Sequence, residues 1–227
     1  SIATDLIISE IIEGNSNNKA IEIYNGTTDT ISLANYSIKV YYNGNTTPNT
    51  NIYFTQYHRI APNDVFVISH QSADPVNILP HADTIYNDAL FNGNDAIALF
   101  NGTDTIDVFG NIGCYPSSSA TSTPIAGWID NGITTTDRTL IRKSNICVGI
   151  TSDPAHTGNT NNTNCPFPTL FDEWIEYPVD YSGNLGHHTA YCYTSGPVIS
   201  QHPVSDTLCA QDTVRFTVGV SGASGQT

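Results

Sequence analysis

The sequence contains no methionine and very little positive charge. Only 7 of its 227 residues are Lys or Arg, against 21 Asp or Glu, so the formal net charge is −14. Binding of nucleic acid through its phosphates requires clustered basic side chains, whereas here they are scattered from Lys19 to Arg215. The charge balance therefore disfavours binding of nucleic acid and of anionic membrane surfaces.

Long apolar segments are also absent. No apolar run approaches the about 20 residues that span a bilayer, so we expect no membrane insertion. The chain begins at Ser1 without a signal peptide, which is typical of a processed, exported protein. Charged residues make up 12% of the chain, about half the usual share, so solubility depends on amides and hydroxyls. These features predict a secreted or cell-surface protein.

Cysteine is scarce, and its spacing fits no metal site. None of the five cysteines forms a CxxC pair or a Cys/His ligand pattern. In an oxidising compartment, five cysteines predict two disulfides and one remaining thiol. The disulfide candidates are Cys114, Cys147, Cys165 and Cys192. A bridge from Cys147 to Cys165 would close one loop locally and leave Cys114 for Cys192, but other connectivities stay open.

The dominant sequence period is two. In Tyr36–Tyr42, apolar residues alternate with Ser37, Lys39 and Tyr41, the pattern of a half-buried strand. Similar strands are predicted at Leu6–Ile12, Ala20–Tyr24, Ile52–Phe54, Val65–Ser69, Ala96–Phe100, Thr105–Phe109 and Arg138–Lys143. Asn-Gly and other turn signals separate them, and no stretch has a sustained helical period. The sequence therefore predicts an all-β sandwich or barrel with long loops.

The chain is predicted to divide near residue 190. Residues 1–190 would form the first domain and 191–197 a linker. In 198–227, Val214, Phe216 and Val218 alternate with polar residues, as in the first strands of an immunoglobulin-like (Ig-like) repeat. About thirty residues bury too little surface to close such a sandwich. We therefore expect an incomplete second domain, with the partner of Cys209 beyond residue 227.

Several segments resemble the lamin tail domain family, in the form found on secreted bacterial proteins. The matching segments, in order, are Asp5–Gly14, Asn17–Asn25, Phe91–Leu99, Ile106–Gly113, Thr139–Lys143, Glu173–Glu176 and Leu185–Thr189. The resemblance implies an Ig-like β-sandwich that has no catalytic activity of its own. It departs from the family in the cysteine-bearing loops. Because fold does not transfer function, it leaves the ligand open.

Acidic and amide side chains around the first hairpin are candidate calcium ligands. Oxygen ligands at this density suit Ca²⁺, and the candidates are Glu10, Glu13, Glu22 and, from a second acidic patch, Asp95. The spacing is not that of an EF-hand loop. The alternative is that the neighbouring Asn residues shape and cap the turn, and we favour this alternative. The sequence implies no other cofactor.

No catalytic motif stands out. The sequence contains neither an HExxH zinc pattern nor a Gly-x-Ser-x-Gly nucleophile elbow. The adjacent His187 and His188 would point to opposite sides of an extended chain, so packing or hydrogen bonding is the better interpretation for them. We predict that the chain is not an enzyme.

Two aromatic residues of the long loops are candidates for surface binding. Exposed rings at Tyr115 and Trp128 would stack on a sugar or a partner protein. The alternative is that they close one end of the sandwich as part of its core.

The tripeptide Asp-Thr-(Ile/Leu/Val) occurs five times. Its threonines are Thr30, Thr84, Thr105, Thr207 and Thr213. The tripeptide resembles the O-glycosylation signature of exported Bacteroidetes proteins, which makes these threonines glycosylation candidates. The alternative is ordinary turn chemistry, in which Asp caps a turn and Thr opens a strand.

Together these features predict a non-catalytic interaction or adhesion module at the N-terminus of a large exported or cell-surface multidomain bacterial protein. Its partners would be a protein or a surface glycan, together with neighbouring Ig-like domains. One alternative is an accessory domain of a secreted hydrolase, such as a nuclease, with its catalytic domain beyond residue 227. Another is a subunit of an extracellular filament.

Overall fold

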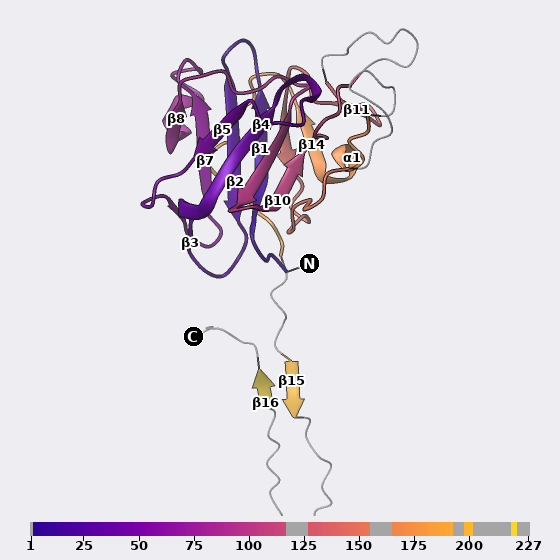
Figure 1. The fold of residues 1–227 in the computed structure, drawn as a ribbon. Coiled ribbons are helices and arrows are strands. Elements are labelled where there is room, and N and C mark those ends of the chain that lie inside the picture. The colour runs from indigo at the N-terminus through magenta and orange to yellow at the C-terminus, as the bar shows by residue number, and fades with distance from the viewer. Residues whose placement is uncertain (1, 117–126, 155–164, 193–197, 202–218, 222–227) are drawn as a thin grey trace, which may run out of the picture.

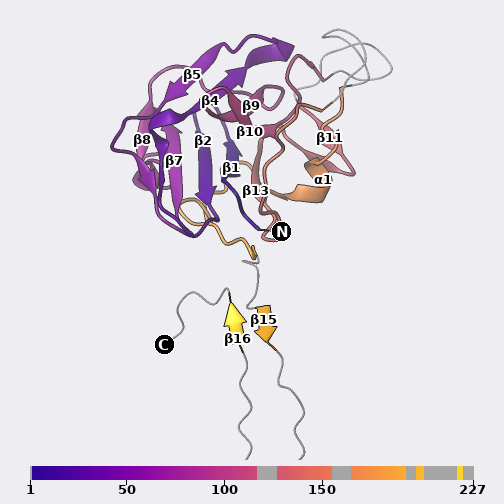
Figure 2. The ribbon, with the colours of Figure 1, turned by 60° about the horizontal axis from the view of Figure 1, so that its bottom comes forward.

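The computed structural model describes residues 2–116, 127–154, 165–192, 198–201 and 219–221 (Figure 1). Two antiparallel-rich sheets face each other, as Figure 2 shows from nearer one end. The six-stranded sheet has the order β14-β13-β1-β2-β7-β8 and the four-stranded sheet the order β10-β9-β4-β5. Their strands are β1 (Leu6–Glu13), β2 (Lys19–Asn25), β4 (Tyr36–Tyr41), β5 (Thr50–Tyr53), β7 (Val65–His70), β8 (Thr84–Tyr86), β9 (Ala96–Asn101), β10 (Asp104–Phe109), β13 (Arg138–Arg142) and β14 (Trp174–Tyr177).

Short elements complete the fold. Two-stranded pairs join β3 (Ile31–Ser32) to β6 (Arg59–Ile60) and β11 (Ile129–Asp130) to β12 (Ile133–Thr134). One helix, α1 (Leu170–Glu173), precedes β14, and single 3₁₀ turns occupy Leu33–Asn35, Tyr42–Gly44 and Leu79–His81. Among the described residues, no helix is long and apolar enough to cross a membrane. The predicted all-β sandwich is confirmed, and all eight predicted strands are present with ends shifted by at most two residues.

The main core lies between the two sheets, and strand alternation explains it. On β4, Ile38 and Val40 are fully buried against the facing sheet, and Ile8 and Ile21 meet them from β1 and β2. Along β1 the register shifts between Ile8 and Glu10, where one extra residue forms a bulge. This bulge changes which face each of the following side chains occupies.

The outer face of the six-stranded sheet is covered as well. A second apolar cluster joins Ile12, Ala20 and Val67 of this face to Ala73, Ile78 and Leu185 from outside the sheet. Leu185 belongs to residues 178–192, which we call the C-terminal strap because they run across the sheet after β14. The strap is held at its start by Thr139, whose hydroxyl donates to the Tyr181 carbonyl at 2.7 Å. Every residue of β1 and β2 is therefore buried, including their glutamates.

The four candidate cysteines form two disulfides, but with a different pairing from the one we considered first. The bridges are Cys114–Cys165 and Cys147–Cys192, with Cα atoms 5.4 and 5.5 Å apart. The loop carrying Cys114 lies beside Pro166, whose carbonyl accepts from the Asn111 side chain at 2.8 Å. A local Cys147–Cys165 bridge was the wrong expectation, because tertiary folding brings the end of the strap to Cys147.

The proposed second domain is described only in part. β15 (Val198–Gln201) pairs antiparallel with β16 (Gly219–Ser221). Cys209, Thr207 and Thr213 lie outside the described residues. The division near residue 190 and the second Ig-like sandwich therefore stay predictions.

Candidate binding end of the sandwich

The two ends of the sandwich differ in which parts of the chain they hold. The N-terminal residues Ile2 and Ala3 line a cavity together with Cys192, the last residue of the strap that the structure describes. The chain thus enters and leaves the sandwich at one end, which Figure 1 marks with N. The 8-residue strand β1 places the turn at Gly14–Asn18 about 26 Å away, at about 3.3 Å per residue. We call this opposite side the distal end.

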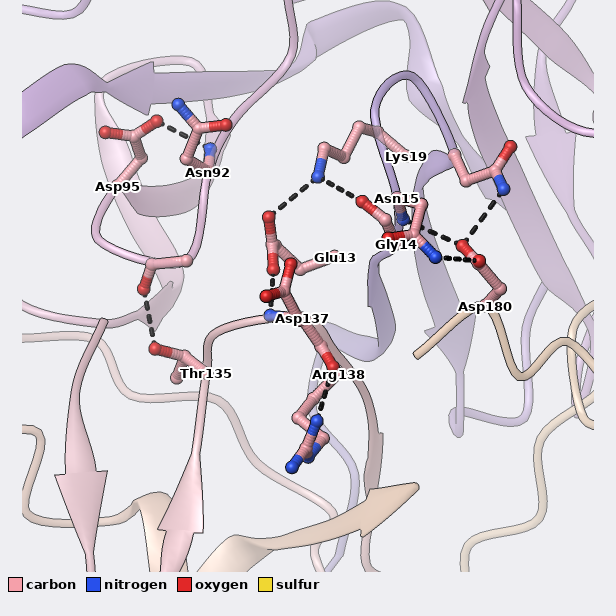
Figure 3. A network of polar contacts seen from close by, with 12 residues as sticks. Glu13, Gly14, Asn15, Lys19, Asn92, Asp95, Thr135, Asp137, Arg138 and Asp180 are labelled. Carbon is pink, nitrogen blue, oxygen red and sulfur yellow. Dashed lines mark hydrogen bonds and ion pairs between the residues drawn. The ribbon is translucent and has the colours of Figure 1, made fainter. Parts of the chain in front are cut away.

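A buried ion pair fixes the first turn of the distal end (Figure 3). The ammonium of Lys19 lies 2.7 Å from Glu13 Oε1 and donates to the Gly14 carbonyl at 2.6 Å. The second oxygen of Glu13 accepts from the Asp137 backbone N–H. Burial raises the pKa of Glu13, and the hydrogen bond from Lys19 opposes that rise. The turn after β1 is therefore tied to the turn before β13.

The same turn is held from the strap. Asp180 accepts hydrogen bonds from the Asn15 backbone N–H at 2.8 Å and the Asn15 side chain at 2.6 Å. It also accepts from the Asn18 side chain at 2.9 Å. Partial burial opposes ionisation of Asp180, but the hydrogen bonds from Asn18 and Asn15 outweigh it and lower its pKa. The Asn residues here build the turn, as the structural interpretation of the sequence predicted.

Asp95 organises the loop that precedes β9. Its two oxygens accept backbone N–H groups from Asn92 at 2.7 Å and from Asn43 at 2.8 Å. Asn43 has φ 51°, a left-handed conformation that Asn tolerates better than most residues. Burial raises the pKa of Asp95, and the two backbone hydrogen bonds oppose the rise. Asp95 therefore joins the turn after β4 to the loop before β9.

These loops enclose a cavity of about 270 Å³ at the distal end. Three of the polar side chains that line it, those of Lys19, His70 and Asp95, are at most 7% exposed. The full lining is Ser16, Asn17, Lys19, Tyr42, Asn43, His70, Ala89, Leu90, Phe91, Asn92 and Asp95. The sequence signals that locate this site are the Asn43-Gly44 and Asn92-Gly93 turns. Lys19, Tyr42 and His70 were missed because they carry no signal of their own.

The four calcium candidates do not form one site. Glu10 and Glu22 are direct cross-strand partners beneath the strap, whereas Glu13 and Asp95 bind other groups at the distal end. Within the described parts of the chain, no group of three or more His, Cys, Asp or Glu is arranged to hold a metal ion. The geometry therefore does not support the calcium interpretation.

Glu10 and Glu22 instead hold the strap. Glu22 accepts from the Ser9 hydroxyl at 2.7 Å and from the Gly186 backbone N–H at 2.8 Å, and Glu10 accepts from the Asn184 side chain at 3.2 Å. Burial, reinforced by the charge of Glu22, raises the pKa of Glu10 to about 8. Burial likewise raises the pKa of Glu22 to about 7.

The surface-binding candidates have different outcomes. Trp128 is 2% exposed and packs edge-on against Phe167, with ring centroids 5.9 Å apart. Trp128 therefore belongs to the core, as the alternative interpretation predicted, and offers no ring for surface binding. Tyr115 is half-buried and packs so close to Gly44 that a side chain added at Gly44 would meet the Tyr115 Cβ. A binding role for Tyr115 stays a prediction.

The described glycosylation candidates are on the surface to differing degrees. Thr30 is exposed, while Thr84 of β8 and Thr105 of β10 are half-buried. Asp83, the first residue of one tripeptide, accepts the Val67 backbone N–H at 2.8 Å. That contact is the turn chemistry of the alternative interpretation. Glycosylation stays a prediction at these threonines.

His188 has the packing role that its motif suggested. It is 7% exposed and packs edge-on against Tyr24 at 4.9 Å between ring centroids. Burial, together with the charge of Arg142, lowers the pKa of His188 to about 4. The ring is therefore neutral at physiological pH and contributes to the outer face of the sheet.

Comparison with known proteins found one family match and similar solved structures. No curated protein matches the chain. Among solved structures, one similar chain is a DUF4876 family protein from Bacteroides thetaiotaomicron, with 12% identity and a TM-score of 0.42, covering 85% of this chain and 72% of that one. The family model described as Lamin Tail Domain matches residues 1–113. This match confirms the lamin tail resemblance inferred from the sequence across the first 113 residues, while the later segments that resemble the family lie outside the matched range.

Proposed function

We propose that residues 1–190 are a non-catalytic interaction module that attaches an exported, multidomain bacterial protein to a surface glycan or a partner protein through the loops of the distal end. One observation carries the proposal: the chain enters and leaves at one end, while a cavity between fixed loops lies at the other. Such an arrangement lets neighbouring domains follow the strap without covering the binding loops.

Two further features support export and attachment. The two disulfides indicate folding in an oxidising compartment. An Ig-like lamin tail domain suggests an accessory or interaction module rather than an enzyme. Binding loops held on a rigid β scaffold are a common way for such modules to recognise partners.

The test is attachment of the purified chain to outer-surface material. The fluorescently labelled chain would be incubated with intact cells of a Bacteroides species and with their extracted surface polysaccharide. We expect saturable binding that falls when the distal end is altered by Asn17→Arg and Asn92→Arg, two exposed positions beside the cavity. The matched control is Asn145→Arg. Asn145 is exposed and lies near the end of the sandwich where the chain enters and leaves, next to Ser144, whose carbonyl accepts from the Tyr191 backbone N–H. Equal loss in the control, or no binding at all, contradicts the proposal.

The second candidate is an accessory domain of a secreted hydrolase, such as a nuclease. This second candidate has the same fold for residues 1–190 but a different domain following it in the chain. The open reading frame that contains this chain distinguishes the two: a hydrolase domain after residue 227 favours the accessory role, and further Ig-like repeats favour attachment.

A further inference from the structure

We infer that the distal cavity is a binding site for a neutral saccharide, with room for one sugar ring at the end of a glycan. This inference rests on the proposed attachment function and names its ligand class. The volume of about 270 Å³ lies just below the range of about 300–1,000 Å³ for drug-sized ligands. The space therefore suits a single ring-sized unit rather than a long segment.

The floor of the cavity offers hydrogen-bond donors for which the described residues supply no acceptor. The Lys19 ammonium has three N–H donors, and two of them bind Glu13 and the Gly14 carbonyl. His70 accepts the Ser72 backbone N–H at its Nδ1, 3.0 Å away. A neutral ring that accepts at Nδ1 carries its proton on Nε2. Lys19 and His70 thus each keep one donor for an oxygen acceptor.

Asp95 supplies acceptors beside these donors. A carboxylate has about four lone-pair positions, and the backbone N–H groups of Asn92 and Asn43 occupy two. Because those contacts hold the carboxylate in place, its remaining lone pairs are already oriented to accept hydrogen bonds from a ligand. A group that both donates and accepts at neighbouring positions matches this floor, and adjacent sugar hydroxyls are such groups.

The walls supply the apolar contact that a sugar ring needs. Tyr42, Leu90 and Phe91 are part of the lining. The Tyr42 hydroxyl lies 2.5 Å from the Thr50 hydroxyl and donates to the Ala89 carbonyl, also at 2.5 Å, which fixes the ring. Aromatic side chains with one polar tip suit sites that are apolar on one side and wet on the other.

The lining of the cavity favours a neutral ligand. The charge of Lys19 is balanced by Glu13 at 2.7 Å, and Asp95 adds a negative charge to the lining. An anionic ligand would meet Asp95 and a chain of formal charge −14. A metal cation would find no group of three or more His, Cys, Asp or Glu arranged to hold it among the described residues. A neutral ligand that is rich in hydroxyls avoids both costs.

The experiment is a titration of the ¹⁵N-labelled chain with neutral monosaccharides and their oligosaccharides, followed by amide NMR shifts and calorimetry. The probes are glucose, galactose, mannose and N-acetylglucosamine, each alone and as a terminal unit. We expect at least one to shift amides of residues 14–19, 42–44, 70–72 and 89–95, with no comparable change near Cys192. Shifts that cluster elsewhere overturn the assignment of the site.

Variants test the donors and the rim separately. His70→Phe keeps a ring and removes the Nε2–H, and Asn92→Ala removes an exposed rim amide while keeping its backbone N–H. Loss of one ordinary hydrogen bond weakens affinity by about 2- to 12-fold, so each variant should bind within that range of loss. Asn145→Ala is the matched control and should bind as the unchanged chain does. The Asn92→Ala arm keeps the test valid if His70→Phe fails to fold.

The outcomes separate this inference from the proposed function. Attachment to surface material that no neutral saccharide competes for sustains the module and overturns the saccharide site. Preference for an acidic saccharide or for a peptide overturns it too. Saccharide binding without attachment to surface material supports the site and counts against the proposed attachment.

Discussion

The buried carboxyls beneath the strap make stability depend on pH in an unusual direction. Glu10 has a pKa of about 8 in the folded chain, against 4.5 for an unperturbed Glu side chain. A group whose pKa is raised by folding contributes stability that is complete below the unfolded value and is lost as pH rises through the folded value. Folding should therefore weaken between about pH 5 and pH 9, because the unfolded chain ionises Glu10 first.

The size of the effect follows from the pKa difference. At about 1.4 kcal/mol for each pKa unit, the rise is worth on the order of 5 kcal/mol. Glu10→Gln keeps the shape and cannot ionise. The variant should match the unchanged chain near pH 5 and exceed its stability near pH 9. For a domain of this size, each kcal/mol shifts Tm by about 2–4 °C, so the gain at high pH is about 10 °C or more.

The assay is thermal unfolding by circular dichroism from pH 5 to pH 9, with the disulfides intact. Asp172→Asn is the control for removing one negative charge, because Asp172 is exposed on α1. Its curve should run parallel to that of the unchanged chain, and the Glu10→Gln curve should separate from both progressively from about pH 5 and level off near pH 9. Curves that stay parallel for all three proteins would refute the argument that burial of Glu10 holds its proton.

Three other perturbations test the core and its cross-links. Asp107→Ala removes one of the two carboxylates that lie 2.9 Å from the fully buried Arg142, the other being Glu173, and removal of one partner of a buried pair costs about 3–5 kcal/mol in urea unfolding. Opening the Cys147–Cys192 bridge with Cys192→Ser frees a loop with a sequence separation of 45 residues, and it should cost about 4 kcal/mol in the same assay. Trp128→Ala should lower the free energy of unfolding by about 3–5 kcal/mol, as for a core aromatic, whereas a change of under about 0.5 kcal/mol would indicate an exposed ring.

Local sequence pattern determined the strands of this protein. Alternation in Tyr36–Tyr42 predicted β4 almost to the residue, because side chains of a strand alternate between two faces whatever its neighbours are. β14 was missed because Trp174–Tyr177 is short and has no alternation, and because it becomes a strand only by pairing with β13. Asn-Gly turns also marked the loops that line the cavity at the distal end.

Only the tertiary structure decided which of these pieces meet. From the sequence, Glu10 and Glu22 are possible calcium ligands, but in the folded chain the strap buries them as a cross-strand pair. Cys147 pairs with Cys192 rather than the nearer Cys165, since the strap ends beside β13. Contacts of this kind depend on the order of the strands in each sheet and on what covers each sheet face. Both are set by residues that lie far apart in the sequence. The sequence determines a sandwich with long loops, and folding alone decides which side chains it buries and which it offers to a ligand.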